Sequence, residues 1–64
     1  MFVIEIAVNG ENGWVKEGAY GFIFSPTLRE ATFYATELEA ACTRCYIERH
    51  LDPTIVKVQN GRTG

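Results

Sequence analysis

Two cysteines separated by two residues, Cys42 and Cys45 in the run CTRC, have the type and spacing that could do chemistry. Such a pair is typical of a redox disulfide or of half a zinc site. Redox pairs lie at a helix N-terminus, where the dipole lowers a thiol pKa, whereas these cysteines fall well inside the helix that the sequence predicts. Zinc needs four ligands, and the one histidine, His50, points away from both thiols around that helix. We therefore predict that the cysteines are packing residues.

One alternative for the two cysteines stays open. Cys42 and Cys45 from each of two chains would together supply the four ligands of a zinc or thiol site. Other catalytic sets are poorer. The one serine, Ser25, stands at the opposite end of the predicted helix from His50 and Asp52, and the glycines belong to turns. We predict no catalysis and no cofactor.

Composition limits the partners. The net charge of −2 provides no field that would attract a phosphate backbone, and we expect no nucleic acid. No apolar run reaches the roughly 18 residues that span a bilayer, so we expect no membrane contact. The absence of a disulfide framework agrees with a reducing compartment, and we expect a cytoplasmic protein. A hydrophobic fraction of 47% indicates a folded chain.

Alternation of apolar and other residues predicts the strands. Residues 2–8 read FVIEIAV, which has the period of a strand. Asn9-Gly10 then predicts a tight turn, because both residues accept positive φ. The returning strand starts at Trp14, is interrupted between Gly18 and Gly21, and is completed or continued with a bulge by residues 22–24. Residues 54–58 predict a last strand.

Residues 26–51 predict one long or kinked helix, with Ser25-Pro26 as its start. Such a helix would be about 39 Å long and would extend beyond its sheet, whose strands span about 25 Å. The run TELE at 36–39 is a capping-box pattern, and we favour a joint near Tyr34 to Thr36 with the main helix starting at Glu37. The stripe expected to cover the sheet is spaced by three and four residues; it contains Leu28, Ala31, Ala35, Leu38, Cys42 and Cys45.

These elements predict an α+β fold of the order ββαβ. The sheet has three antiparallel strands in the order 2-1-3, covered by the long or kinked helix. Residues 1–58 form a single domain, and residues 59–64 form a frayed tail.

A second apolar stripe on the predicted helix contains Phe33, Ala40, Ile47 and Leu51. A monomer with one helical layer leaves this stripe in water, so we predict a homodimer through the helix layer. The alternative is that the joint near Thr36 rotates the helix and takes part of the stripe into the core. Trp14 and Tyr20 are further candidates for exposed anchors on the hairpin.

The run WVKEGAYGFIFSPTLREATFYATELEA resembles a pattern of small uncharacterised phage and prophage proteins, a glycine-rich aromatic hairpin followed by LxxAxxFxTxxEA and a valine-rich strand. The matching positions are Leu28, Ala31, Tyr34 or Phe33, Thr36, Glu39 and Ala40. The resemblance implies a small ββαβ accessory protein and no catalytic residue. We therefore predict a phage-type protein that binds another protein, for example a host-directed inhibitor acting in the host cytoplasm.

Overall fold

The computed structural model of the protein describes residues 1–58, and the predicted frayed tail at 59–64 lies outside the described residues. Residues 1–58 form four strands, one α-helix and two 3₁₀ turns. In chain order these are β1 (Phe2–Val8), β2 (Glu11–Gly18), β3 (Gly21–Ser25), η1 (Leu28–Glu30), α1 (Glu37–Arg44), η2 (Arg49–Leu51) and β4 (Thr54–Lys57).

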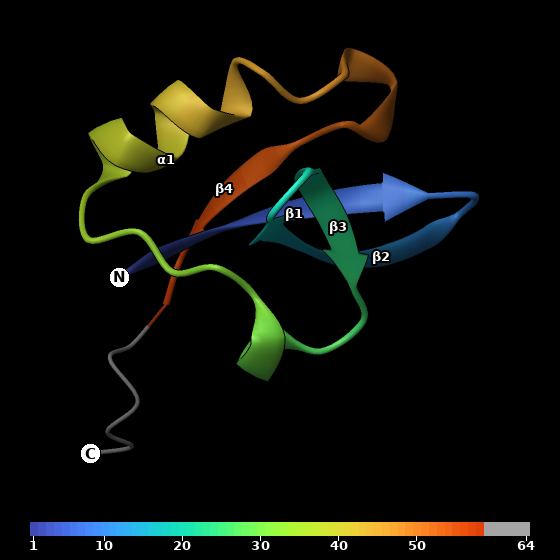
Figure 1. Cartoon of the computed structure of the whole chain (residues 1–64), viewed down its shortest axis with the longest axis horizontal. Coiled ribbons are helices and arrows are strands. Elements are labelled where there is room, and N and C mark those ends of the chain that lie inside the picture. The colour runs from blue at the N-terminus through green and yellow to red at the C-terminus, as the bar shows by residue number, and fades with distance from the viewer. Residues whose placement is uncertain (59–64) are drawn as a thin grey trace.

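The strands form one antiparallel sheet in the order β3-β2-β1-β4 (Figure 1). The predicted neighbours of the first strand, the returning strand on one side and the last strand on the other, are present. The α+β class is confirmed, but the predicted architecture is wrong, because within residues 1–58 the sheet has four strands and no long helix covers it.

Two turns explain the extra strand. Asn9 and Gly10 have φ of 52° and 85°, as predicted for the turn between β1 and β2. The interruption between Gly18 and Gly21 is a second hairpin turn rather than a bulge, since Gly18 pairs with Gly21 and the chain reverses at Ala19 and Tyr20. Alanine and tyrosine are not typical turn residues. The flanking glycines permit the reversal, and Gly21 has a φ of 138°.

The predicted long or kinked helix is also wrong, although its main start is right. The α-helix begins at Glu37 and ends at Arg44. The Thr36 hydroxyl accepts a hydrogen bond from the Glu39 N–H at 3.1 Å, as the capping-box pattern predicts. The Glu39 carboxylate accepts from the Ala35 N–H at 3.2 Å, one residue before the position that a standard box uses.

The chain before α1 is extended because it bonds to the sheet instead of to itself. Phe2 and Tyr34 exchange two backbone hydrogen bonds of 2.8 Å. The Thr32 N–H donates to the Val15 carbonyl at 3.0 Å, and the Glu17 N–H donates to the Thr32 hydroxyl at 2.8 Å. Thr32, Phe33 and Tyr34 are β-branched or aromatic, which suits an extended conformation. Residues 32–34 thus join the start of β1 to the second half of β2.

The sheet lies between two layers of chain (Figure 1). On one face, α1 packs against β4 and β1, and on the other, η1 packs against β2. The main core lies under α1 and the chain that follows it. Its buried members are Ile4, Ile6, Val15, Tyr34, Ala40 and Ile47.

The two predicted helix stripes have exchanged roles. The stripe expected to cover the sheet is largely exposed, with Leu38 at 74% of its maximum. Ala40 is fully buried because α1 packs against β1 and β4. Ile47 is nearly as buried, because the chain leaves the helix after Arg44 and turns toward the sheet. Helical spacing therefore could not place these side chains, since only eight of the residues between 26 and 51 are α-helical.

Within residues 1–58, no helix is long and apolar enough to cross a membrane.

Candidate functional site

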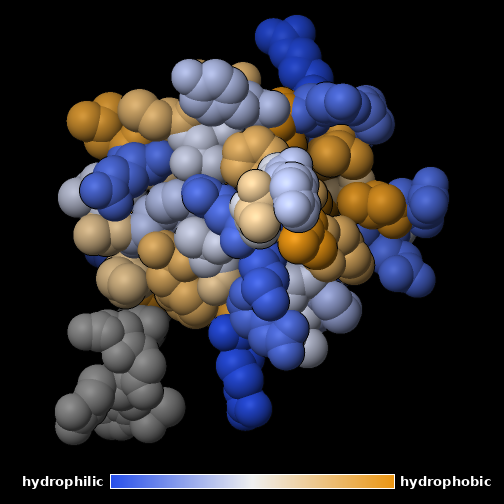
Figure 2. Space-filling model, viewed as in Figure 1, coloured by the Kyte–Doolittle hydropathy of each residue, from blue (hydrophilic) through white to orange (hydrophobic). Residues whose placement is uncertain are grey.

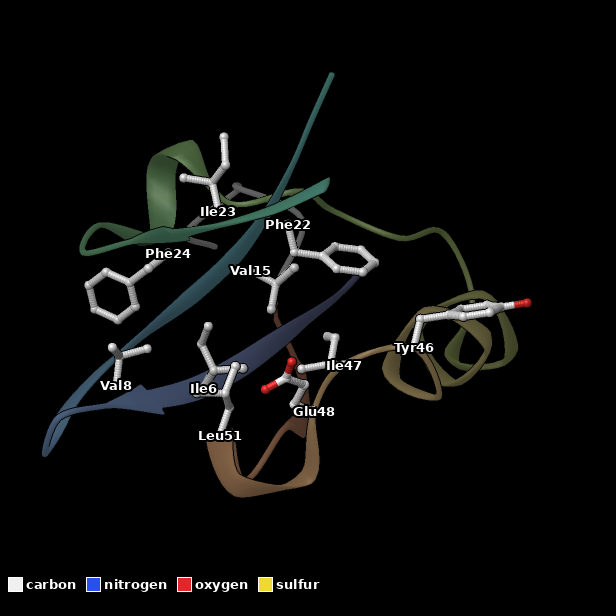
Figure 3. A pocket seen from close by; sticks show the side chains of 10 residues that line it. All are labelled: Ile6, Val8, Val15, Phe22, Ile23, Phe24, Tyr46, Ile47, Glu48 and Leu51. Carbon is white, nitrogen blue, oxygen red and sulfur yellow. The ribbon is translucent and has the colours of Figure 1, made fainter. Parts of the chain in front are cut away.

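An open apolar cleft lies on the α1 face of the sheet, between β3 and the chain after α1 (Figure 3). We call it the apolar cleft; its volume is about 400 Å³. All three strands from β1 to β3 contribute to its lining, as do residues 46–51. The lining residues are Ile6, Val8, Val15, Phe22, Ile23, Phe24, Tyr46, Ile47, Glu48 and Leu51.

The alternation of side chains along β3 places Phe22 and Phe24 in the lining, and we call these two residues the aromatic wall of the cleft. Val15 pairs with Phe24 and Glu17 with Phe22, so these four residues share one face of the sheet. Figure 3 shows Phe22 and Phe24 on that face, with Ile23 pointing to the opposite side of β3. Ile23 is also half exposed, at 51%.

Glycine at position 13 makes room for one of these rings. A Cβ atom at Gly13 would lie 2.3 Å from the Phe24 ring and 2.8 Å from the Ser25 carbonyl oxygen. The ring therefore lies directly over the β2 backbone at this glycine. The close approach keeps Phe24 half-buried, whereas Phe22 remains 45% exposed.

The opposite wall comes from the chain between α1 and β4. Ile47 is buried and Leu51 half-buried, and Tyr46 is 80% exposed at the rim. Glu48 is the one charged residue in the lining that residues 1–58 provide. Its carboxylate lies 3.2 Å from His50 Nδ1, and its side chain remains 74% exposed.

The aromatic wall is also an edge of the sheet, because β3 is the last strand in the order. Apolar surface gathers in Figure 2 where Figure 1 places β3. Exposed aromatic and aliphatic side chains beside a cleft are typical of a surface that contacts another molecule. The cleft is thus suited to binding an apolar group.

A buried tyrosine, Tyr34, joins β2 to the segment that precedes α1. The Tyr34 hydroxyl donates to the Glu17 carboxylate at 2.5 Å. Burial and, to a smaller extent, the hydrogen bond to Glu17 together raise the pKa of Tyr34 from 10.0 to about 12. The phenol therefore stays protonated and holds β2 to the 32–34 segment.

The structure separates the predicted site residues. Ala40 and Ile47 are buried within one chain, Leu51 is half-buried, and Phe33 is 38% exposed. The stripe is thus not left in water, and the reason given for dimerisation through it is wrong. Of the predicted hairpin anchors, Tyr20 is fully exposed in the turn and Trp14 is half-buried.

Sequence reasoning missed the aromatic wall and Tyr46. Phe22-Ile23-Phe24 was assigned to the completion of the returning strand, which hides the fact that it forms an edge. The glycines on both sides of Ala19-Tyr20 are the signal that could have revealed a second turn.

The predicted packing role of the cysteines is wrong. Cys42 and Cys45 are both free and exposed, because the helix presents its other side to the sheet. In the part of the chain that the structure describes, no group of three or more histidine, cysteine or acidic residues could hold a metal ion. One chain supplies only this pair of thiols to any metal site.

A second hollow, of about 590 Å³, lies beside the end of α1. It is lined by charges of both signs, from Arg44, Arg49 and Asp52, together with Cys45, Ile47 and Pro53. Mixed charges without a buried polar group favour no particular ligand there.

Comparisons with known protein families, curated sequences and solved structures find no match for the chain.

Proposed function

We propose that the protein acts by binding another protein through the apolar cleft, with no catalysis of its own. The observation that supports this proposal is the cleft itself, about 400 Å³ and lined by aliphatic and aromatic side chains, with Phe22 and Tyr46 exposed at its sides. Small proteins rarely leave such a surface in water without a use for it. This role is that of a small phage-type accessory protein in the cytoplasm, and inhibition of a host protein is one form of it.

A matched pair of variants tests the proposal. Phe22→Asp places a charge in the cleft wall, and Leu28→Asp places the same charge on η1, on the other face of the sheet. The two residues are similarly exposed, at 45% and 37%. Both variants are expected to keep the wild-type circular dichroism spectrum.

The measurement is affinity capture from cells that naturally contain the protein, followed by quantification of the bound proteins. We expect a stoichiometric partner that Leu28→Asp retains and Phe22→Asp loses. A partner retained equally by both variants, or none with the wild type, contradicts the proposal.

Exposure of the two thiols favours a second candidate, a zinc or thiol site in which Cys42 and Cys45 of two chains combine. Two associating chains would supply the four ligands that one chain lacks. The test is elemental analysis of protein purified without chelator. If the site exists, we expect one zinc ion per two chains. A zinc content near zero excludes the zinc site.

A further inference from the structure

We propose that the occupant of the apolar cleft is an extended basic segment of a partner protein. This segment adds a strand to the free edge of β3 and lays an arginine or lysine side chain across the cleft toward Glu48. The inference rests on the proposed function and names the kind of partner that it requires.

The two edges of the sheet differ in how they are protected. β4 carries Lys57 and has α1 packed against it, and a lysine on an edge strand is a common device against strand addition. β3 reads GFIFS, with no charged residue and no proline within the strand. Exposed, apolar and uncharged, β3 is the edge that accepts another strand.

The register of the hairpin decides which backbone groups are free. Gly18 and Gly21 close a two-residue turn and form a hydrogen-bonded pair, after which such pairs alternate along the ladder. Ile23 therefore bonds to β2, while the N–H and C=O groups of Phe22 and Phe24 point away from it. Among residues 1–58, none of the backbone hydrogen bonds outside the strand ladders and helices uses Phe22 or Phe24.

The residues opposite Phe22 and Phe24 on β2 follow the same alternation. Val15 and Glu17, which stand opposite them on β2, turn their backbone groups to the other side, where both bond to Thr32. A strand added to β3 would bond to Phe22 and Phe24, and residues directly opposite in a ladder share a face. Its alternate side chains would then lie on the face of the apolar cleft.

Charge selects the occupant. Among the described residues that line the cleft only Glu48 is charged, and the chain has a net charge of −2. Arginine and lysine have apolar stems that can cover Phe22 and Leu51 while the cationic head reaches a carboxylate. A basic segment thus complements both the surface and the charge.

A second copy of the chain fits this site less well. Antiparallel pairing of β3 with β3 would cover the edge with a strand that has no cation, and the whole copy carries the same negative charge.

Amide hydrogen exchange measured by NMR tests the edge directly. In the free protein we expect slow exchange at Ile23 and fast exchange at Phe22 and Phe24. The probe is a short blocked peptide in which threonine alternates with valine, arginine and valine, so that the last three face the cleft. At saturating peptide, exchange at Phe22 and Phe24 should slow by tenfold or more, while the exchange at Ile23 changes little.

Two controls separate strand addition from simple apolar contact. The same peptide with methylated backbone nitrogens on the edge-facing side keeps its side chains but loses its donors, and we expect roughly tenfold or greater weakening. Glu48→Gln should weaken the arginine peptide by roughly two- to fivefold, as for an exposed ion pair. Glu30→Gln, on η1 and also exposed, should leave its affinity unchanged.

Each other outcome overturns the inference in a recognisable way. Peptide binding without protection of Phe22 and Phe24, or equal binding of the methylated peptide, excludes strand addition but leaves the cleft as a contact surface. Protection of both amides in the free protein, rising with protein concentration, identifies a second copy as the occupant. Absence of binding at millimolar peptide excludes the basic segment, and the capture experiment with Phe22→Asp still decides the proposed function.

Discussion

The two halves of the sheet are completed in different ways. Over β1 and β4, α1 and the chain after it supply Ala40 and Ile47, and Ile4 beneath them is fully buried. Over β2 and β3 the same face carries Phe22 and Phe24, and the apolar cleft remains open. One face of one sheet is thus a core at one end and an exposed surface at the other.

The difference teaches where a chain of 64 residues uses its apolar side chains. A small domain buries a limited fraction of its surface, and one short helix covers only part of a four-stranded sheet. The covered half stabilises the fold. In the uncovered half Phe24 still packs against the core, but Phe22 remains 45% exposed, which is why we propose a binding role for this surface.

The largest expected contrast is between two isoleucines. Ile4 is fully buried in the covered half and Ile23 is 51% exposed on the edge strand. Ile4→Ala should lower the free energy of unfolding by about 2 to 5 kcal/mol, because it leaves a cavity. Ile23→Ala should lower it by less than about 1 kcal/mol, because much of that side chain is already in water. Urea denaturation followed by circular dichroism measures both, and equal losses would mean that the two halves are equally packed.

The next largest effect concerns Tyr34, which bonds to Phe2 in one half of the sheet and to Glu17 in the other. Its pKa is raised to about 12 by burial and by the hydrogen bond to Glu17, while the unfolded chain titrates near 10. Below about pH 10 both states keep the proton and the contribution is fully present. Between about pH 10 and 12 only the unfolded chain loses it, so stability falls by about 2 to 3 kcal/mol.

Tyr34→Phe isolates this effect, since phenylalanine cannot ionise. The difference in unfolding free energy between wild type and Tyr34→Phe should shrink as the pH rises from 9 toward 12, as measured by urea denaturation at each pH. Tyr46→Phe is the matched control, because Tyr46 is 80% exposed. A pH dependence that Tyr46→Phe alters as much as Tyr34→Phe would contradict the assignment.

The sequence predicted what local chemistry decides. The Asn9-Gly10 turn, the pairing of the first strand with both neighbours and the helix start at Glu37 follow from turn, period and capping signals. Residues 26–36 could not be predicted in this way. Nothing in TLREATFYAT forbids a helix, and residues 32–34 are extended because Phe2 and Val15 supply distant hydrogen-bonding partners.

The candidate site was less predictable than the fold, because its residues lie in the two segments whose structure was predicted wrongly, β3 and the chain after α1. Assigning β3 to the preceding strand concealed an edge, and continuing the helix past Arg44 placed Ile47 on a regular stripe instead of in a wall of the cleft. Cys42 and Cys45 were assigned to the core for the same reason. A binding surface built from three strands and a non-helical segment has no periodic signature.

The smallest expected effect concerns two threonines that precede helical turns. Thr36 stands before α1 and its hydroxyl accepts from the Glu39 N–H, which otherwise lacks a partner within the helix. Thr36→Ala should lower the free energy of unfolding by about 1 kcal/mol, because α1 covers the β1 and β4 half. Thr27 stands before η1 in the same extended conformation, but its side chain makes no capping hydrogen bond.

Thr27→Ala is therefore the control, and it should change the unfolding free energy by less than about 0.5 kcal/mol, as expected for a surface substitution. Both variants remove the same atoms, so the difference between them reports the cap and not the intrinsic preference for alanine. Chemical denaturation with a shared denaturant slope resolves a difference of this size. Equal values would show that α1 is held by its contacts with β1 and β4 alone. A larger loss for Thr27→Ala would mean that the η1 turn against β2 contributes more to stability than the cap of α1 does.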